Sequence, residues 1–470
     1  MNTADSQRLA SALEQLGYAP ADHVEGADVV VLNTCVVRQA AEDKVYGRLS
    51  SLRPLKQRKP DVVIALMGCL VGLKDPAPLL RRFPWVDVFM PPSEPEPLLE
   101  YLAGRGLVDE ARAVEAAAAR RCHLQDGDTA VARSGGRPQQ GDVPDVLIRD
   151  VADGGTSVIP LIRVLPARER GRLVSAYVPV VLGCSHACTY CVIPYRRGPE
   201  HSRPPADILA EAQALAAQGV KEITLLGQIV DRYGLDLPPA SCISSLADLL
   251  RHTHEIEGLQ RIRFLTSHPN WMTDELLEAV AVLPKVCEHI EVPVQAGDDE
   301  VLARMQRGYT ADDYRDLIAR IRARIPGVSI ATDVIVGFPG ETEVQFQRTC
   351  DLLAELRLDK AHIARYSPRP QTLATRHFPD DVPPEEKERR RKALDDLQAR
   401  IVAEINARLL GETVEVLVEG KKKNRWWGRT RTDKLVFFED QHQGDWHGQL
   451  AQVRITWTGP WSLIGEAGRR

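Results

Sequence analysis

Three cysteines stand close together on one short segment of this sequence. An apolar run over 178–182 ends at Gly183, and Cys184, Cys188 and Cys191 follow within a single loop. Three thiolates can bind three irons of a 4Fe-4S cube and leave the fourth iron without a protein ligand. An open metal position is where a substrate or cofactor can bind. The spacing therefore predicts a cluster whose free iron does chemistry.

A structural zinc site is the alternative interpretation of these cysteines. His186 or a distant residue would then be the fourth ligand. Zinc loops usually pair two ligands with a second pair further along the chain. No such second pair follows Cys191, so the spacing favours iron and sulfur over zinc.

The C-x3-C-x-aromatic-C pattern, with Tyr190 before the last cysteine, resembles the signature of the radical S-adenosylmethionine enzymes. This resemblance implies that the open iron chelates S-adenosylmethionine and that an electron from the cluster cleaves it to a deoxyadenosyl radical. Such a radical can abstract hydrogen from an unactivated C–H bond, which side-chain acids and bases cannot do.

Further segments are similar to motifs of one branch, the methylthiotransferases. They are Asn33-Thr34-Cys35, 41–49, Gly68-Cys69, 193–198, 226–228, 266–269, 293–297 and 337–342. The resemblance covers nearly the whole chain. It implies radical sulfur insertion at the adenine carbon between two ring nitrogens, followed by methyl transfer, with isopentenyladenosine beside the tRNA anticodon as substrate. Related family members that act on threonylcarbamoyladenosine in tRNA or on a ribosomal protein aspartate are the close alternatives.

Cys35 and Cys69 each follow an expected strand of the first domain. Loops at that edge of a parallel sheet converge, so the two thiols can approach each other. The resemblance implies that they hold an auxiliary 4Fe-4S cluster that carries the transferred sulfur. The family's first cysteine has no counterpart here, because this sequence begins at Met1-Asn2. We expect either a start further upstream or a second cluster that is held differently, for example through Cys122.

The same resemblance places four residues near S-adenosylmethionine: Gln228, Gln295, Asp333 and Gly337. The segment 333–340 reads as an apolar strand that runs into a Gly/Pro turn. Thr342 and Gln345 are spaced as a capping box for the helix that follows.

Basic residues gather in three places. Arg196, Arg197 and Arg203 follow the thiol loop and are either a solvated patch or phosphate contacts. The run 387–392 alternates charges and is expected to be a solvated helix face. The segment 421–434 mixes basic and aromatic residues, which suits phosphate contact and base stacking, and it resembles the TRAM RNA-binding domain. The RNA contacts we expect are Lys421, Lys422, Lys423, Arg425, Trp426, Arg429 and Arg431. A hairpin with an exposed charged turn is the alternative.

The elements that must position these residues read as an α/β protein. Helices at 8–16 and 40–52 alternate with strands at 28–32 and 61–67, which predicts a Rossmann- or flavodoxin-like parallel sheet. Six strand–helix units then follow, a pattern typical of a partial (β/α)6 barrel, with strands at 177–182, 223–226, 262–266, 289–294, 330–336 and 361–366. A charged helix over 385–409 precedes short strands at 413–418, 434–438, 450–456 and 461–464, which predict a small β-barrel. The expected domains are 1–122, a linker at 123–169, a radical core at 170–408 and a TRAM barrel at 411–468.

Composition excludes a membrane or disordered protein. Of the 470 residues, 44% are hydrophobic and 27% are charged, with a formal net charge of -5, so any RNA footprint must be local. We find no apolar run long enough to span a bilayer and no signal peptide, and expect a cytoplasmic protein. Nine cysteines in a reducing compartment favour metal ligands over disulfides, although Cys242, Cys287 and Cys350 are expected to be buried packing residues. The implied partners are tRNA carrying isopentenyladenosine, an electron donor such as flavodoxin or ferredoxin, and a sulfur donor.

Overall fold

The computed structural model describes residues 1–34, 39–72, 77–108, 165–238, 241–439 and 444–468. The chain divides into two units. The N-terminal unit comprises Asn2–Arg170 together with Tyr195–Arg197, and the core unit comprises Gly171–Pro194 and Gly198–Arg470, with Met1. No helix among the described residues has the length and apolar character needed to cross a membrane.

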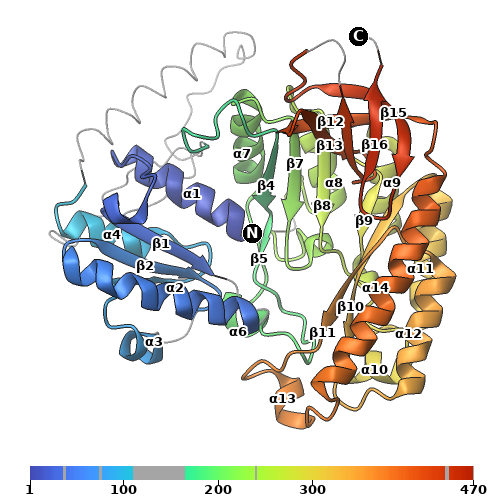
Figure 1. Cartoon of the computed structure of the whole chain (residues 1–470), viewed down its shortest axis with the longest axis horizontal. Helices are drawn as coiled ribbons and strands as arrows, with labels where there is room; N and C mark the ends of the chain where they lie inside the picture. Colours follow the sequence, from blue (N-terminus) through green and yellow to red (C-terminus); the bar gives the residue numbers. More distant parts are fainter. Residues whose placement is uncertain (35–38, 73–76, 109–164, 239–240, 440–443, 469–470) are drawn as a thin grey trace. The chain divides into compact units, whose positions relative to one another are not determined.

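The N-terminal unit is a three-stranded parallel sheet with helices packed against it (Figure 1). Its elements are α1 (Asn2–Gln15), η1 (Val24–Gly26), β1 (Val29–Thr34), α2 (Gln39–Arg58), β2 (Val63–Gly68), α3 (Ala77–Arg82), β3 (Val88–Met90) and α4 (Glu96–Gly104). Every residue of β2 is buried because this strand lies between β1 and β3. Val63, Ala65 and Met67 of β2 share one apolar cluster with Leu9 of α1 and Leu98 of α4. The predicted parallel α/β sheet is confirmed.

The core unit begins with six parallel strands, each followed by helical segments. The first sheet has the order β4-β7-β8 and the second the order β9-β10-β11, with parallel pairing throughout (Figure 1). The strands are β4 (Ser175–Pro179), β7 (Glu222–Leu226), β8 (Arg261–Leu265), β9 (His289–Glu291), β10 (Ser329–Val336) and β11 (Lys360–Arg365). Ile262 of β8 donates to the carbonyl of Lys285 and accepts from the N–H of Cys287. These bonds join β8 to the segment that leads into β9. This arrangement is the predicted partial barrel.

Shorter strands and the helices complete this part of the chain. They are β5 (Val181–Leu182), α6 (Ile193–Arg197), β6 (His201–Ser202), α7 (Pro205–Ala217), η2 (Val230–Arg232), α8 (Leu246–His254), η3 (Pro269–Trp271), α9 (Asp274–Val282), α10 (Asp299–Arg304), α11 (Ala311–Arg324), α12 (Glu343–Leu356), α13 (Leu373–His377) and α14 (Pro384–Ala407). The predicted strand at 177–182 is two strands, because β5 leaves the parallel sheet and pairs antiparallel with β6. The predicted capping box is present: Thr342 accepts from the backbone of Gln345, and the Gln345 side chain accepts from the backbone of Thr342.

The C-terminal residues form a closed five-stranded barrel with the order β12-β13-β14-β16-β15. Its strands are β12 (Thr413–Lys422), β13 (Arg425–Thr430), β14 (Leu435–Glu439), β15 (Leu450–Thr458) and β16 (Leu463–Ala467). Val416, Trp426, Phe438 and Ile455 are among the side chains that fill its core. The barrel was predicted, but β13 was not, because its charged and aromatic residues read as an RNA-binding segment.

Buried arginines fasten this barrel to the six-stranded core. Arg261 on β8 donates to the carbonyl oxygen of Arg429 at 2.7 Å, and Arg263 donates to the carbonyls of Thr430 at 2.7 Å and Arg431 at 2.8 Å. The Arg263 side chain is only 4% exposed and pairs with the equally buried Glu222 at 2.9 Å. The β13–β14 turn is therefore held against the end of the six-stranded core at which β7 and β8 begin.

Candidate metal centre

The three cysteines of the first motif lie on a loop that leaves β5 at Gly183. This glycine has a φ of 68°, and a Cβ atom there would lie 2.0 Å from the carbonyl oxygen of Pro199. Only glycine fits that approach without displacing backbone. The backbone N–H of Cys184 then donates to the carbonyl of Gly198 at 3.0 Å. The loop thus starts from a fixed point at the carboxyl end of the strand.

Thr189 ties the far side of the loop to the segment that follows α10. Its backbone N–H donates to the carbonyl of Met305 at 3.1 Å, and its hydroxyl donates to the carbonyl of Arg304 at 2.8 Å. Its own carbonyl accepts from the backbone of Ala374 at 2.7 Å. These bonds fix the position of Cys188, the residue before it, relative to two other strand–helix connections.

Cys184 packs in an apolar cluster with Ile193 and Ile229, and the partly buried Cys191 packs against it. Burial raises the pKa of Cys184 to about 11 and that of Cys191 to about 12. Burial also disfavours the charged form of Cys188, but a hydrogen bond from His186 and the charge of Arg307 outweigh it and lower its pKa to about 7. A cationic metal group would remove the cost of ionising the other two.

Four rings surround one side of this loop. His186, between the first two cysteines, lies 4.7 Å from the ring of His268 and 5.4 Å from that of Trp271, and Tyr309 lies 5.6 Å from His268. Burial and the charge of Arg307 hold the pKa of His268 far below its ordinary value, so its ring stays neutral. The Nε2 atoms of His186 and His268 are buried and have no hydrogen-bond partner among the described residues. Buried polar atoms without partners are rare, and a bound group beside the thiols would satisfy them.

This donor set fits a cluster better than a single ion. Across the described ranges, no three His, Cys, Asp or Glu side chains lie close enough to hold one metal ion together. A zinc ion needs its ligands to converge on one point, whereas the thiolates of a cube bind separate irons. The residues present therefore fit a 4Fe-4S cluster, with Cys184, Cys188 and Cys191 as the residues that would hold it.

The predicted cofactor contacts lie on three strands of the core. Gln228 follows β7, Gln295 follows β9, and Gly337 follows β10. The buried Gln295 has a φ of 74°, and its N–H donates to the carbonyl of Asp333 at 2.9 Å. Asp333 lies within β10 rather than at its end. Gln295, Asp333 and Gly337 are thus brought to two neighbouring strands, and Gln228 lies in the other sheet.

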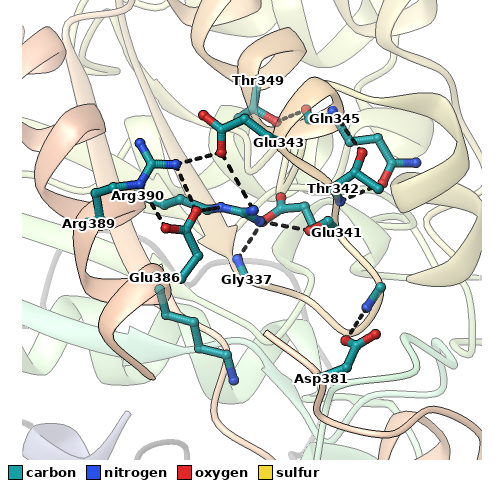
Figure 2. Close-up of polar contacts among 12 residues, drawn as sticks. Gly337, Glu341, Thr342, Glu343, Gln345, Thr349, Asp381, Glu386, Arg389 and Arg390 are labelled. Atoms are coloured by element: carbon teal, nitrogen blue, oxygen red, sulfur yellow. Dashed lines mark hydrogen bonds and ion pairs between the residues drawn. The ribbon is translucent and has the colours of Figure 1, made fainter. Parts of the chain in front are cut away.

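The turn after β10 is held by a buried ion pair (Figure 2). The carboxylate of Glu341 accepts from the N–H of Gly337 at 2.6 Å and from Arg390 of α14 at 2.8 Å. The side chains of Glu341 and Arg390 are 1% and 6% exposed. Lys387 is also buried and would clash with a Cβ at Gly337. The run 387–392 is therefore not a solvated face throughout, because two of its cations pack on this turn.

Cys69 lies at the edge of the parallel sheet in the N-terminal unit. Gly68, the residue before it, pairs with Thr34, the residue before Cys35. The N–H of Cys69 donates to the carbonyl of Thr34 at 3.1 Å. The two predicted ligands therefore follow paired positions of adjacent strands. Cys35 and Cys122 lie outside the described residues.

Arg197 is a hydrogen-bond partner of Cys69, whereas its sequence position predicted a solvated residue or a phosphate contact. Its Nε donates to the Cys69 thiol at 3.2 Å, and its guanidinium lies 3.6 Å from the carboxylate of Asp5. Arg203 is also buried, where it pairs with Glu211 at 2.7 Å. Arg197 and Arg203 are therefore neither a solvated patch nor available phosphate contacts. Cys242 also differs from expectation, since it is exposed.

The barrel divides the expected RNA contacts into two groups. Lys421, Lys422, Lys423 and Arg425 are exposed on the β12–β13 hairpin, whose turn residues Lys423 and Asn424 both have positive φ. The stretch is therefore a hairpin with an exposed charged turn, and its basic side chains are open to solvent.

The remaining three expected contacts are occupied within the protein. Trp426 is 8% exposed and packs in the barrel core. Arg429 pairs with Asp433 at 3.1 Å. Arg431 pairs with Glu288 at 2.7 Å and joins the barrel to the core. These placements correct the expectation that all seven side chains face RNA.

Arg307 and His268 lie near the thiols, and no role was predicted for either of them. Arg307 donates to the thiol of Cys188 at 3.3 Å across a separation of 119 residues. A lone arginine in a loop carries no local signal of such a contact. His268 lies in a segment that resembled the family, but spacing could not show that its ring packs on the loop.

Three family models match this chain. The Radical SAM superfamily matches residues 178–353, the Uncharacterized protein family UPF0004 matches residues 1–91, and the TRAM domain matches residues 407–467. Together with six parallel strands and a three-thiol loop after the first of them, these matches define a radical S-adenosylmethionine protein.

Curated relatives narrow this class. A tRNA-2-methylthio-N(6)-dimethylallyladenosine synthase of Roseiflexus sp. (strain RS-1) is 47% identical over 100% of this chain and 88% of its own length. Proteins of the same name from Chloroflexus aurantiacus and Herpetosiphon aurantiacus are 45% and 44% identical over 99% of this chain, and over 89% and 95% of their own lengths. The chain belongs to the methylthiotransferase family of which these synthases are members, and it is a radical S-adenosylmethionine enzyme.

Proposed function

We propose that this enzyme converts N6-dimethylallyladenosine, the isopentenyladenosine beside the tRNA anticodon, to its 2-methylthio derivative. The observation that carries the proposal is the identity of up to 47% over the whole chain with synthases named for that product. The three-thiol loop supplies the chemistry that the reaction needs, because the adenine C–H bond is too inert for acids and bases.

Cys184, Cys188 and Cys191 are proposed to hold the cluster that reacts with the cofactor. When bound, a 4Fe-4S cluster with S-adenosylmethionine supplies the electron that yields a hydrogen-abstracting radical. The protein contributes Ile193 and Ile229, which pack on Cys184 and keep water away from that thiol. Water exclusion protects reactive species from side reactions.

Gln228, Gln295, Asp333 and Gly337 are proposed to bind S-adenosylmethionine. Their amide and carboxylate groups can bond to the amino and hydroxyl groups of such a cofactor. The Glu341–Arg390 pair supports this role by fixing the position of the Gly337 turn.

The auxiliary site is proposed to lie at Cys35 and Cys69, with a second 4Fe-4S cluster as the source of the inserted sulfur. A sulfur donor must then reload it, and an electron donor such as flavodoxin or ferredoxin must reduce the first cluster. The proposed domains are 1–122, the linker 123–169, the radical core 170–408 and the TRAM barrel 411–468. We place the enzyme in the cytoplasm, where its tRNA substrate is found.

The exposed hairpin residues Lys421, Lys422, Lys423 and Arg425 are proposed to contact the tRNA backbone. Exposed basic side chains bind phosphates and release counterions. Arg425 pairs with Glu439 on the surface at 2.9 Å, and an exposed pair of this kind is weak enough for a phosphate to displace it.

The substrate assignment is tested by mass spectrometry of tRNA nucleosides from a strain that lacks the gene. We expect 2-methylthio-isopentenyladenosine to disappear and isopentenyladenosine to accumulate. The wild-type gene and a Cys242→Ala variant should restore the product, whereas Cys188→Ala should not. Loss of 2-methylthio-threonylcarbamoyladenosine, or of a methylthio group on a ribosomal protein aspartate, would instead assign the enzyme to one of those substrates.

A further inference from the structure

Arg307 lies in the connection between α10 and α11 and is almost completely buried, with 4% of its surface exposed. All three nitrogens of its guanidinium are engaged. Nη1 donates to the thiol of Cys188 at 3.3 Å, Nη2 to the carbonyl of Pro293 at 3.1 Å, and Nε to the hydroxyl of Tyr309 at 2.9 Å. The planar fork is therefore fixed by partners on both sides of the thiol contact.

The partners of Arg307 are themselves anchored. The Tyr309 hydroxyl lies 2.8 Å from the carbonyl of Val294 and 3.1 Å from that of Pro293, so it can donate to either. The hydrogen bonds from Thr189 to the carbonyls of Arg304 and Met305 join the thiol loop to the same segment. The guanidinium and the Cys188 side chain are thus positioned by one connected network.

Within the described part of the chain, no carboxylate forms an ion pair with the charge of Arg307. The groups that interact with it are the Cys188 thiol, the phenols of Tyr190 and Tyr309 and the neutral imidazole of His268. A buried cation is costly unless an anion accompanies it. The Cys188 sulfur, 3.3 Å from Nη1, is the neighbour of Arg307 that belongs to the thiol loop. An anionic group built on that sulfur would supply the missing charge.

We propose that Arg307 is a positioning residue of the thiol loop that holds Cys188 and makes the cluster bound there easier to reduce. This inference rests on the proposed function, because it assumes that Cys184, Cys188 and Cys191 hold the 4Fe-4S cluster. One-electron reduction adds negative charge to a cluster, and a cation with a hydrogen bond to a ligand sulfur stabilises the reduced form more than the oxidised form. Hydrogen bonds to the sulfurs are among the factors that set cluster potentials.

The experiment is a redox titration followed by electron paramagnetic resonance. The full chain is used in a Cys35→Ala/Cys69→Ala background, so that any signal comes from the loop cluster, and it is reconstituted anaerobically with iron and sulfide. Arg307→Gln removes the charge and keeps hydrogen-bonding capacity. Arg307→Lys keeps the charge but lacks the planar guanidinium group. Arg304→Gln is the matched control, because Arg304 lies on the same segment but bonds Gln345 at 3.2 Å instead of a thiol.

We expect Arg307→Gln to make reduction about tenfold less favourable, which is about 59 mV for one electron. Arg307→Lys should recover part of that loss, and Arg304→Gln should change the equilibrium constant by less than about threefold, or about 28 mV. The resonance signal reports only loaded molecules, so a variant with reduced iron content still gives a potential.

An unchanged potential in Arg307→Gln, or an equal shift in Arg304→Gln, would overturn the inference. Failure of the proposed function has a different signature. In that case the background protein itself would bind no iron, or would show no signal of a reduced 4Fe-4S cluster, before Arg307 is changed.

Discussion

The two thiol sites of this protein are built in opposite ways. Cys184, Cys188 and Cys191 share one loop and lie within eight consecutive residues. Cys69 is placed by a parallel sheet, where Gly68 pairs with Thr34 across segments far apart in the chain. A site on one loop depends on that loop's turns, whereas a site at a sheet edge depends on strand register. We therefore expect a substitution that disrupts one thiol site to leave the other intact.

The largest expected effect is that of Cys188→Ala. Removal of one of three thiolates should abolish deoxyadenosine formation from S-adenosylmethionine, because the loop could no longer hold its cluster. Chromatography of reduced reaction mixtures measures this product. The exposed Cys242 provides the control, since Cys242→Ala should react at the wild-type rate. Undiminished cleavage by Cys188→Ala would contradict the role of the loop.

The comparison is sharpened by Cys69→Ala. This variant should still cleave S-adenosylmethionine, because the loop is intact, but should form no methylthio product. Deoxyadenosine and modified nucleosides are measured in the same mixture. Equal loss of both products would show that the two sites do not act independently.

Gly183→Ala tests how strictly the loop is positioned. The new Cβ would lie 2.0 Å from the carbonyl oxygen of Pro199 at a φ of 68°, so backbone must move. We expect a loss of about 3 kcal/mol in the free energy of unfolding and reduced iron content. Gly171→Ala is the control, because Gly171 has a φ of 70° with nothing within 4 Å, and about 1 kcal/mol of strain alone is expected there. Denaturant titration of both variants separates the clash from the strain.

Thr34→Val should have the smallest effect and concerns the sheet edge. The Thr34 hydroxyl donates to the carbonyl of Met67 at 2.9 Å and accepts from the N–H of Leu70 at 3.4 Å, on either side of Cys69. Its loss leaves buried polar groups unpaired, at a cost of about 1–3 kcal/mol. Methylthio product should fall while cleavage of S-adenosylmethionine persists. An exposed hydroxyl, removed by Thr456→Val, should change stability by less than about 0.5 kcal/mol.

The sequence was most informative where structure is local. The thiol loop, the six strands and the Thr342 capping box depend on residues close in the chain, and all three patterns predicted the structure found. The strand β13 was missed because its inward positions, Trp426, Gly428 and Thr430, alternate with Trp427 and Arg429 and include a glycine, which hid the period of two. That same alternation could have shown that Trp426 belongs to the barrel core.

Contacts between distant segments could not be predicted. Arg431 looked like a phosphate ligand until Glu288, from another strand–helix unit, proved to be its partner. Arg307 and Arg197 meet their thiols across separations of 119 and 128 residues. The type of residue shows what a side chain can do, but only the fold decides which partner it meets.

The arginine anchors beneath the C-terminal barrel affect how nucleic acid can be gripped. An RNA-binding module on a loose tether must lose orientational freedom each time it helps to hold a substrate, and affinity falls by that amount. Here Arg261 and Arg263 have already removed that freedom during folding. A strand of tRNA that contacts the β12–β13 hairpin would therefore be bound at a fixed distance from the thiol loop. A change in the position or orientation of the C-terminal barrel would change which nucleotide reaches the thiol loop.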